Sequence, residues 1–190
     1  INEGVPLIDS ANFHRRDLNV SNFMMPDGSQ CLMTFGGVFR YDKNLPYLNP
    51  IKINSTPTIN ADTLPYHQKY AHYTCANFGI YDATSQRSTQ VFMGGISLND
   101  YNFITQQPEM DTLVPFINKI NEMSFNSDGT IQEQINDYEL PGLLGSNASF
   151  LINKNVSISG SDKILNGNLI GNNNLFCGYF YGGIKACLLY

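Results

Sequence analysis

Short apolar runs alternate with clusters of Gly, Asn, Asp, Pro and Ser along nearly the whole chain, and apolar positions at helical spacing are almost absent. This pattern is typical of strands separated by turns, and it predicts an all-β fold. Two turns are clear, at residues 26–29 (PDGS) and 126–130 (NSDGT). The second separates Phe125 from Ile131 and predicts a hairpin with Asp-Gly at the bend.

An apolar run that breaks on two adjacent glycines occurs three times, at Gly36-Gly37, Gly94-Gly95 and Gly182-Gly183. Other segments recur in step with it: residues 45–53 match 114–123, and residues 75–82 resemble 147–155. Internal repetition at this scale indicates a propeller or another repeat array. We divide the chain into approximate repeats 13–82, 83–155 and 156–190, within one domain or a fragment of a larger propeller.

The glycine pairs have a physical reason in a propeller, where narrow sheets pack face to face around an axis. A glycine lets a neighbouring backbone approach closely and permits a bulge or a bend. The interval between the second and third pairs is longer than the first. We expect the Asn- and Gly-rich residues 159–174 to supply the difference as a long solvated loop.

Composition narrows the range of partners. Hydrophobic residues make up 42% of the 190, charged residues only 14%, and the net charge is −5. The chain has no basic run that could follow a phosphate backbone, which argues against nucleic acid as a partner. No apolar stretch approaches about 18 residues, so we expect no membrane-spanning helix. Both ends look cut or processed, as after removal of a signal peptide or in part of a longer chain.

The four cysteines lie in apolar, strand-like runs, and none forms a C-x-x-C pair. The simplest interpretation is four buried free thiols that act as small hydrophobic side chains. One or two disulfides are the alternative in an oxidising compartment, and spacing does not say which cysteines would pair. The cysteines are Cys31, Cys75, Cys177 and Cys187.

The glycine-pair strands resemble kelch repeats. Together with HRRDLNV (14–20), LPYLNPIKI (45–53), YAHYTCANFGIYD (70–82) and LPGLLGSNASFLI (140–152), they are similar to a group of secreted β-propeller proteins of the Bacteroidota that are associated with type IX secretion. The resemblance covers most of residues 13–186. It implies a kelch-like propeller that is periplasmic, outer-membrane-associated or secreted. It implies no catalytic residues, and only about three repeat units are visible where a closed propeller needs at least four.

A second resemblance bears on compartment. Bacteroidota O-glycosylate exported proteins at Asp-Ser or Asp-Thr followed by a small or aliphatic residue, and this pattern marks Ser10, Thr63 and Thr112. Ordinary Asx-type turns produce the same dipeptides, so both interpretations stay open.

Three regions hold candidate chemistry. Residues 66–75 (YHQKYAHYTC) have residue types that bind copper in propeller oxidases, but without a traceable ligand arrangement, and we interpret them as a strand with polar tips at the surface. His14, Arg15 and Arg16 form the one dense cationic patch; it suits a carboxylate or phosphate, or an ion-pair cluster with Asp17. The long loop at 97–111, with Asp100 and Tyr101, is a candidate partner-binding loop.

We therefore predict a non-catalytic, extracytoplasmic propeller that binds a protein partner through its loops, and the type IX outer-membrane secretion apparatus is the specific partner to test. The partner-binding residues we select are His14, Arg15, Arg16, Asp100 and Tyr101. The alternatives are a carbohydrate-active propeller enzyme, a glycan-binding surface protein and a structural matrix component. We predict no catalytic residue, no metal site and no cofactor, because no carboxylate pair, phosphate loop or zinc pattern is present.

Overall fold

The computed structural model describes residues 6–54, 60–102, 104–160, 163–170 and 174–186. These residues form thirteen β-strands and one short 3₁₀ helix, η1 (Gly167–Leu169), and no α-helix is present among them. The predicted all-β class is therefore confirmed. No described helix has the length and apolar character that a membrane span requires.

The first sheet is a four-stranded antiparallel meander. Its strands are β1 (Asn19–Met24), β2 (Gln30–Phe35), β3 (Ile51–Asn54) and β4 (Asn60–Thr63), and each pairs with the next along the chain. The turn at residues 26–29 joins β1 to β2, as the sequence predicted.

The second sheet contains a similar meander. Its strands are β5 (Ala76–Asp82), β6 (Arg87–Ile96), β9 (Phe116–Asn126) and β10 (Ile131–Glu139), which lie side by side in that order. The predicted hairpin around residues 126–130 is confirmed, because Phe125 pairs with Ile131 across it. Between β6 and β9 the chain forms a separate two-stranded hairpin, β7 (Asn99–Asn102) and β8 (Gln107–Met110).

The third sheet pairs β11 (Leu144–Ile152) with β13 (Gly178–Lys185). The connection between them differs from the long solvated loop that we expected. It carries β12 (Ile164–Asn166), which adds to β5 as a parallel edge strand, and Ile164 and Leu165 are buried there. Two apolar residues in a polar, Asn-rich stretch were too weak a signal to predict this strand.

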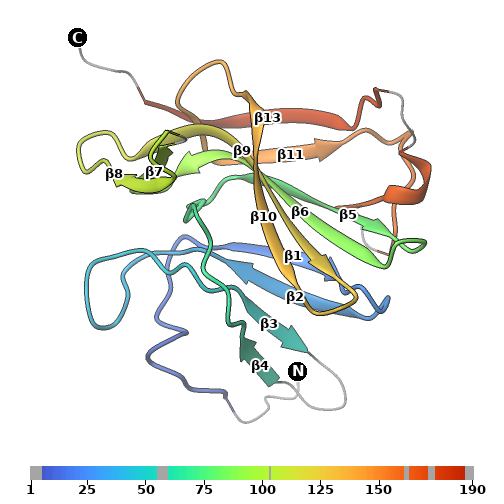
Figure 1. The fold of residues 1–190 in the computed structure, drawn as a ribbon, viewed down its shortest axis with the longest axis horizontal. Coiled ribbons are helices and arrows are strands. Elements are labelled where there is room, and N and C mark those ends of the chain that lie inside the picture. Colours follow the sequence, from blue (N-terminus) through green and yellow to red (C-terminus); the bar gives the residue numbers. More distant parts are fainter. Residues whose placement is uncertain (1–5, 55–59, 103, 161–162, 171–173, 187–190) are drawn as a thin grey trace.

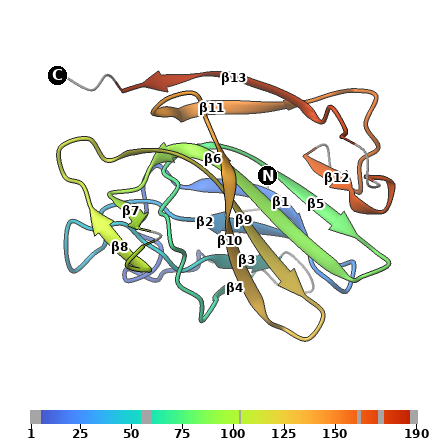
Figure 2. The ribbon, with the colours of Figure 1, turned by 45° about the horizontal axis from the view of Figure 1, so that its top comes forward.

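The three sheets stack as layers, with the second in the middle (Figures 1 and 2). One apolar core lies between the first and second sheets and centres on Phe23, Phe35 and Phe92. A second core lies between the second and third sheets and centres on Phe78, Val91 and Phe150. Because β6 faces a core on both sides, its second half, residues 91–96, is a continuous apolar run instead of an alternating one.

The three glycine pairs occupy the same place in each layer. The residue just before each pair is matched, across the antiparallel strand pair, with a residue of the layer's first strand. Two positions upstream of that partner, the backbone turns left-handed. The matched pairs are Phe35–Asn19, Met93–Ala76 and Tyr181–Ser149, and the left-handed residues are Asp17 (φ 56°), Thr74 (φ 35°) and Asn147 (φ 58°). The repetition in sequence is thus a repetition in register and backbone geometry.

We name the three residues that precede each left-handed residue a lead-in segment: residues 14–16, 71–73 and 144–146. The last residue of each lead-in pairs with the residue just after the glycine pair of its own layer, in the pairs Arg16–Val38, Tyr73–Ile96 and Ser146–Ile184. Successive layers are also linked: Thr74 N–H donates to Asp17 O (3.2 Å), and Asn147 N–H donates to Thr74 O (2.6 Å).

The three described cysteines are free thiols. Cys75 is buried in the first core, whereas Cys31 and Cys177 are half-buried. Burial raises the pKa of the Cys75 thiol to about 12, so this sulfur stays protonated and behaves as a small apolar side chain. Cys187 lies outside the described residues.

Candidate functional site

The strands β2, β6 and β13 all reach their glycine pairs at the same end of the molecule, which we call the Gly-Gly end (left in Figure 1). The loops that follow the first two pairs leave a groove of about 240 Å³ between them. Its walls come from both loops and from the second lead-in, and they are mostly apolar: Val38, Phe39, Leu45, Pro46, Tyr73, Ile96, Leu98 and Pro115.

Two walls of this groove have an unusual backbone. Phe39 (φ 63°) and Leu98 (φ 67°) are left-handed, a conformation that large apolar side chains rarely adopt. Each costs of order 1 kcal/mol relative to ordinary backbone. Both lie on the loops that follow a glycine pair, and their left-handed backbone fixes the direction of the two apolar walls of the groove.

The three residues of the predicted cationic patch, His14, Arg15 and Arg16, have two different roles. Arg15 is an internal support: its guanidinium donates to the carbonyl oxygens of Asn12 (2.7 Å), Gly36 (3.0 Å) and Asn49 (2.7 Å), and it lies 4.4 Å from the ring centroid of Tyr47. Burial lowers the pKa of Arg15 to about 10. This side chain holds the loop after Gly37 in place and is not available to grip a free anion.

His14 and Arg16 are exposed beside the groove. Arg16 lies over the Phe39 ring at 5.1 Å from its centroid. His14 Nδ1 lies 2.9 Å from Phe39 O, and its ring meets Tyr41 edge-on at 6.5 Å. Among the described residues neither arginine forms an ion pair with Asp17, so the ion-pair cluster is not what orders this patch.

Asp100 and Tyr101 lie on the other loop, in β7. Asp100 accepts a hydrogen bond from the hydroxyl of Tyr70 (3.2 Å), and Lys69 Nζ lies 5.0 Å from the Tyr101 ring centroid. These contacts fasten the β7–β8 hairpin to the segment that crosses from the first sheet to the second. The predicted residues lie at the Gly-Gly end in two separate places: His14 and Arg16 are on the first lead-in segment, against Phe39, and Asp100 and Tyr101 are on the second loop.

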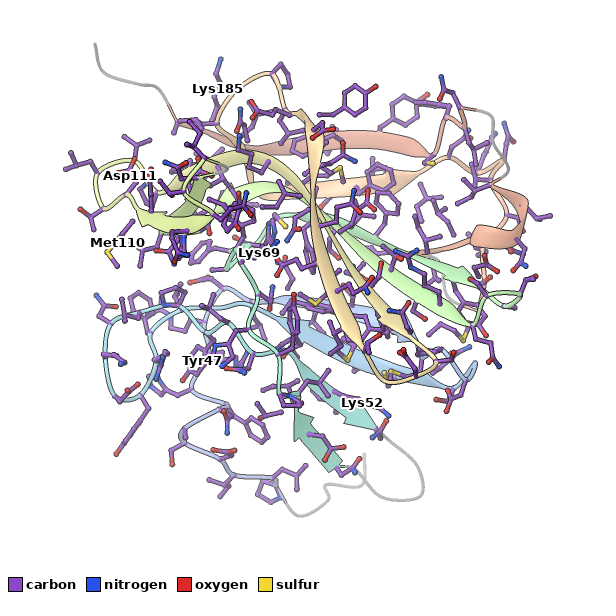
Figure 3. The ribbon with its side chains drawn as sticks, viewed as in Figure 1. Tyr47, Lys52, Lys69, Met110, Asp111 and Lys185 are labelled. Carbon is purple, nitrogen blue, oxygen red and sulfur yellow. The ribbon has the colours of Figure 1, made fainter. Side chains whose placement is uncertain are left out.

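The same hairpin region carries three large apolar side chains that face solvent: Ile104 is 93% exposed, Met110 61% and Leu113 92%. Figure 3 shows Met110 and Asp111 at the outer edge of β8, away from the body of the molecule. Tyr41, which is 70% exposed, adds a fourth from the first loop. Apolar side chains gathered on a projecting hairpin beside an apolar groove are a feature of protein-binding surfaces.

A buried polar network lies beneath this end and corrects our interpretation of residues 66–75. They do not form a surface strand: Tyr70 and His72 have 0% exposure, and His72 stacks on Phe92 at 4.7 Å. The His72 Nδ1–H faces Gly94 O (3.3 Å), and its Nε2 accepts from Asn121 Nδ2 (3.0 Å). Burial lowers the pKa of His72 to about 4, so the ring is neutral at pH 7.

Asn121 connects His72 to the half-buried carboxylate of Glu133. It also donates to Glu133 Oε1, while Glu133 Oε2 accepts from the backbone N–H of Lys69 (2.7 Å) and the hydroxyl of Tyr66 (3.3 Å). Burial raises the pKa of Glu133, and the same burial raises the pKa of Tyr66. Because protein donors occupy both carboxylate oxygens, we interpret Glu133 as a structural support for the crossing segment.

A larger cleft of about 480 Å³ lies elsewhere, between the turns at residues 26–29 and 126–130. Two of its polar side chains are engaged within those turns: Asp27 Oδ1 accepts from Ser29 N–H (2.9 Å), and Asn126 donates to Thr130 Oγ1 (3.0 Å). A ligand site needs polar groups that converge on the ligand. We therefore place the candidate site at the smaller groove.

The three glycosylation candidates, Ser10, Thr63 and Thr112, are all exposed. Their modification stays a prediction. In the part of the chain that the structure describes, no three His, Cys, Asp or Glu side chains gather in a way that could hold a metal ion.

No protein-family profile, curated protein sequence or solved structure gives a match to this chain. The class is therefore defined by the coordinates: an all-β protein of stacked antiparallel sheets with a partly apolar loop surface at one end.

The sequence analysis selected the loop at 97–111 and the cationic residues 14–16, but it did not select the loop after Gly37, and it missed the large apolar residues of both loops. The left-handed backbone of Phe39 and Leu98 could not be predicted, because nothing in the sequence indicates that a residue with a bulky apolar side chain adopts it. Ile104, Met110 and Leu113 carried a usable signal, since large apolar residues in a loop without alternation have no strand face to fill.

Proposed function

We propose that this chain is part of an extracytoplasmic, kelch-like β-propeller that binds a protein partner without catalysing a reaction. The observation that carries the binding role is the exposure of Ile104, Met110 and Leu113 on the hairpin beside the apolar groove. Water contact with that much apolar surface is unfavourable, and a partner that covered it would recover about 25 cal/mol per Å² buried.

The propeller interpretation has its own support. A propeller blade is a four-stranded antiparallel sheet, and the first and second sheets each contain a four-stranded meander. The first strands of successive layers lie against one another, β1 on β5 and β5 on β11, as the inner strands of neighbouring blades do. The glycine pair lies at or near the end of the strand that pairs with the first strand of each layer.

A partner that fits this surface presents apolar side chains at its centre and at least one acidic group at its edge. The groove would take the apolar side chains, and His14 and Arg16 stand beside it to receive a carboxylate. Our expectation of the type IX secretion apparatus as that partner rests on the sequence resemblance alone.

Site-specific photo-crosslinking in native envelopes tests the proposal. A photoreactive residue at Ile104 is expected to give a discrete adduct with one protein, and Leu113→Asp in the same chain is expected to abolish it. The matched control places the photoreactive residue at Leu169, which is 66% exposed on η1. Identical adducts from both positions, or no adduct from Ile104, would count against a binding surface at the Gly-Gly end.

A further inference from the structure

Each glycine pair in the interior of the stack receives the backbone of the following layer. A methyl group on Gly36 would overlap the carbonyl oxygen of Ala71, and one on Gly94 would overlap that of Leu144. Ala71 and Leu144 are the first residues of the second and third lead-in segments. The contact is therefore the same one made twice: a glycine of one layer against the first residue of the next lead-in.

The third layer carries the same glycine without the contact. Gly182 (φ 71°) has the geometry of Gly36 and Gly94, but no heavy atom of the described residues lies within 4 Å of a methyl group placed on it. Gly36 and Gly94 are buried, whereas Gly182 and Gly183 are exposed. At this end of the stack the backbone has the geometry that contacts a following layer, but no described residue lies against it.

The first layer has the other half of the contact, the first residue of its lead-in segment, but no described glycine lies against it. By its position before Arg16, His14 corresponds to Ala71 and Leu144, and it is exposed. No layer of the described residues precedes it. One chain thus holds both halves of a contact that it already makes twice internally, one at each end.

The outer faces of the two end sheets suit each other as well. On the third sheet the outward side chains are Leu151 (49% exposed), Tyr179 (61%) and Tyr181 (68%), and Leu151 pairs with Tyr179 across the strands. On the first sheet Val20 is 55% and Leu32 41% exposed. Beside them runs an apolar groove of about 340 Å³, whose walls include Phe13, Leu18 and Ile53.

We propose that two copies of this chain associate head to tail, with the third sheet of one copy on the first sheet of the other. His14 of each copy then lies over Gly182 of its neighbour, and the Asp17 N–H stands where Thr74 and Asn147 make their links between layers. Two such contacts close a ring of six layers with two-fold symmetry. This inference does not depend on the proposed partner-binding surface, because the exposed hairpin residues Ile104, Met110 and Leu113 take no part in it; His14 is the one residue that both proposals use.

Light scattering coupled to size-exclusion chromatography tests this over a concentration series. The expected result is a concentration-dependent species of twice the 21.2 kDa chain mass. Tyr181→Ser on one end, or Val20→Ser on the other, is expected to raise the dissociation constant about tenfold or more. The matched control Tyr138→Ser removes a side chain that is 79% exposed on β10 and should change nothing.

Mixing the two end variants distinguishes a head-to-tail contact from any other dimer. Each mixed pair keeps one intact contact, between the unchanged first sheet of the Tyr181→Ser chain and the unchanged third sheet of the Val20→Ser chain. At its other contact the mixed pair carries both substitutions, and the second loss costs less than the first because residues that share a contact are not additive. The mixture is therefore expected to associate more tightly than either variant alone. A single monomer at every concentration, a dimer that neither end variant weakens, or a mixture no tighter than its components would each overturn the proposal.

Discussion

Arg15 and His72 are different residues in the same position, the middle of a lead-in segment. Each points a side-chain N–H at the carbonyl of the first glycine in its own layer, Arg15 at Gly36 (3.0 Å) and His72 at Gly94 (3.3 Å). In the third layer the middle position is Gly145, which has no side chain to offer. A left-handed glycine carbonyl inside a packed stack needs a donor, and these two residues supply it.

The His72 assignment makes a pH prediction. Its folded pKa of about 4 lies below the usual 6.5, so the unfolded chain binds a proton in this interval and the folded chain does not. The stability due to a neutral His72 is complete above pH 6.5. It falls by about 1.4 kcal/mol per pH unit between 6.5 and 4.

Urea unfolding across pH 4–7 measures this loss. The His72→Gln variant should lack this part of the slope, and His67→Gln, an exposed control, should keep it. The raised pKa of Glu133 acts in the opposite sense, because its contribution is lost as pH rises, but it is present in all three proteins. Parallel curves for the wild-type protein and His72→Gln would refute a buried neutral imidazole.

Arg15 and Arg16 provide a matched pair of neighbours. Arg15→Met removes three hydrogen bonds from a charged donor and leaves carbonyls of Asn12, Gly36 and Asn49 without it, so we expect a loss of about 3 kcal/mol in unfolding free energy. Arg16→Met removes an exposed side chain and should cost less than about 1 kcal/mol. Equal losses in thermal or urea unfolding would show that Arg15 is not the internal support.

At the scale of elements, the central sheet and the β7–β8 hairpin are opposites. β6 lies between two cores and pairs with β5 and β9, whereas β7 and β8 pair with each other. We therefore expect amide hydrogens of β6 to exchange only on global unfolding, and those of β7 and β8 to exchange by local opening at a much lower free energy.

Hydrogen exchange with mass spectrometry measures both rates in one experiment. The Tyr70→Phe variant removes the hydroxyl that donates a hydrogen bond to Asp100. It should speed hydrogen exchange in β7 without affecting β6. Protection of the hairpin equal to that of β6 would mean that it belongs to the core and is not a projecting loop.

The elements were also what the sequence predicted best. Local patterns define two hairpins, one with Pro-Asp-Gly at residues 26–28 and one with Asp-Gly at residues 128–129. The apolar run in β6 is long enough to indicate a strand buried on both faces. β12 and the crossing segment at residues 66–75 were missed. Their positions depend on contacts with β5, Asn121 and Glu133, which are far away in sequence and have no local signature.

At the scale of the whole molecule, one backbone contact is repeated between successive layers, beside the two apolar cores that lie between them. The recurrence of glycine pairs and the close approach of a neighbouring backbone were both predicted from the sequence, and the structure adds which backbone it is: the next layer lies on Gly36 and on Gly94. The hydrogen bonds from Thr74 to Asp17 and from Asn147 to Thr74 join the same pairs of layers. A candidate binding surface forms at the end where the glycine pairs meet.

The unfolding free energies of Gly36→Ala, Gly94→Ala and Gly182→Ala test this account most directly. All three positions are left-handed, so each substitution costs about 1 kcal/mol in backbone strain. Gly36→Ala and Gly94→Ala also collide with the next layer and should lose about 3 kcal/mol or more in total. Measured by urea unfolding at low protein concentration, where association contributes little, Gly182→Ala should lose only the strain cost. Equal losses at all three positions would contradict the repeated contact.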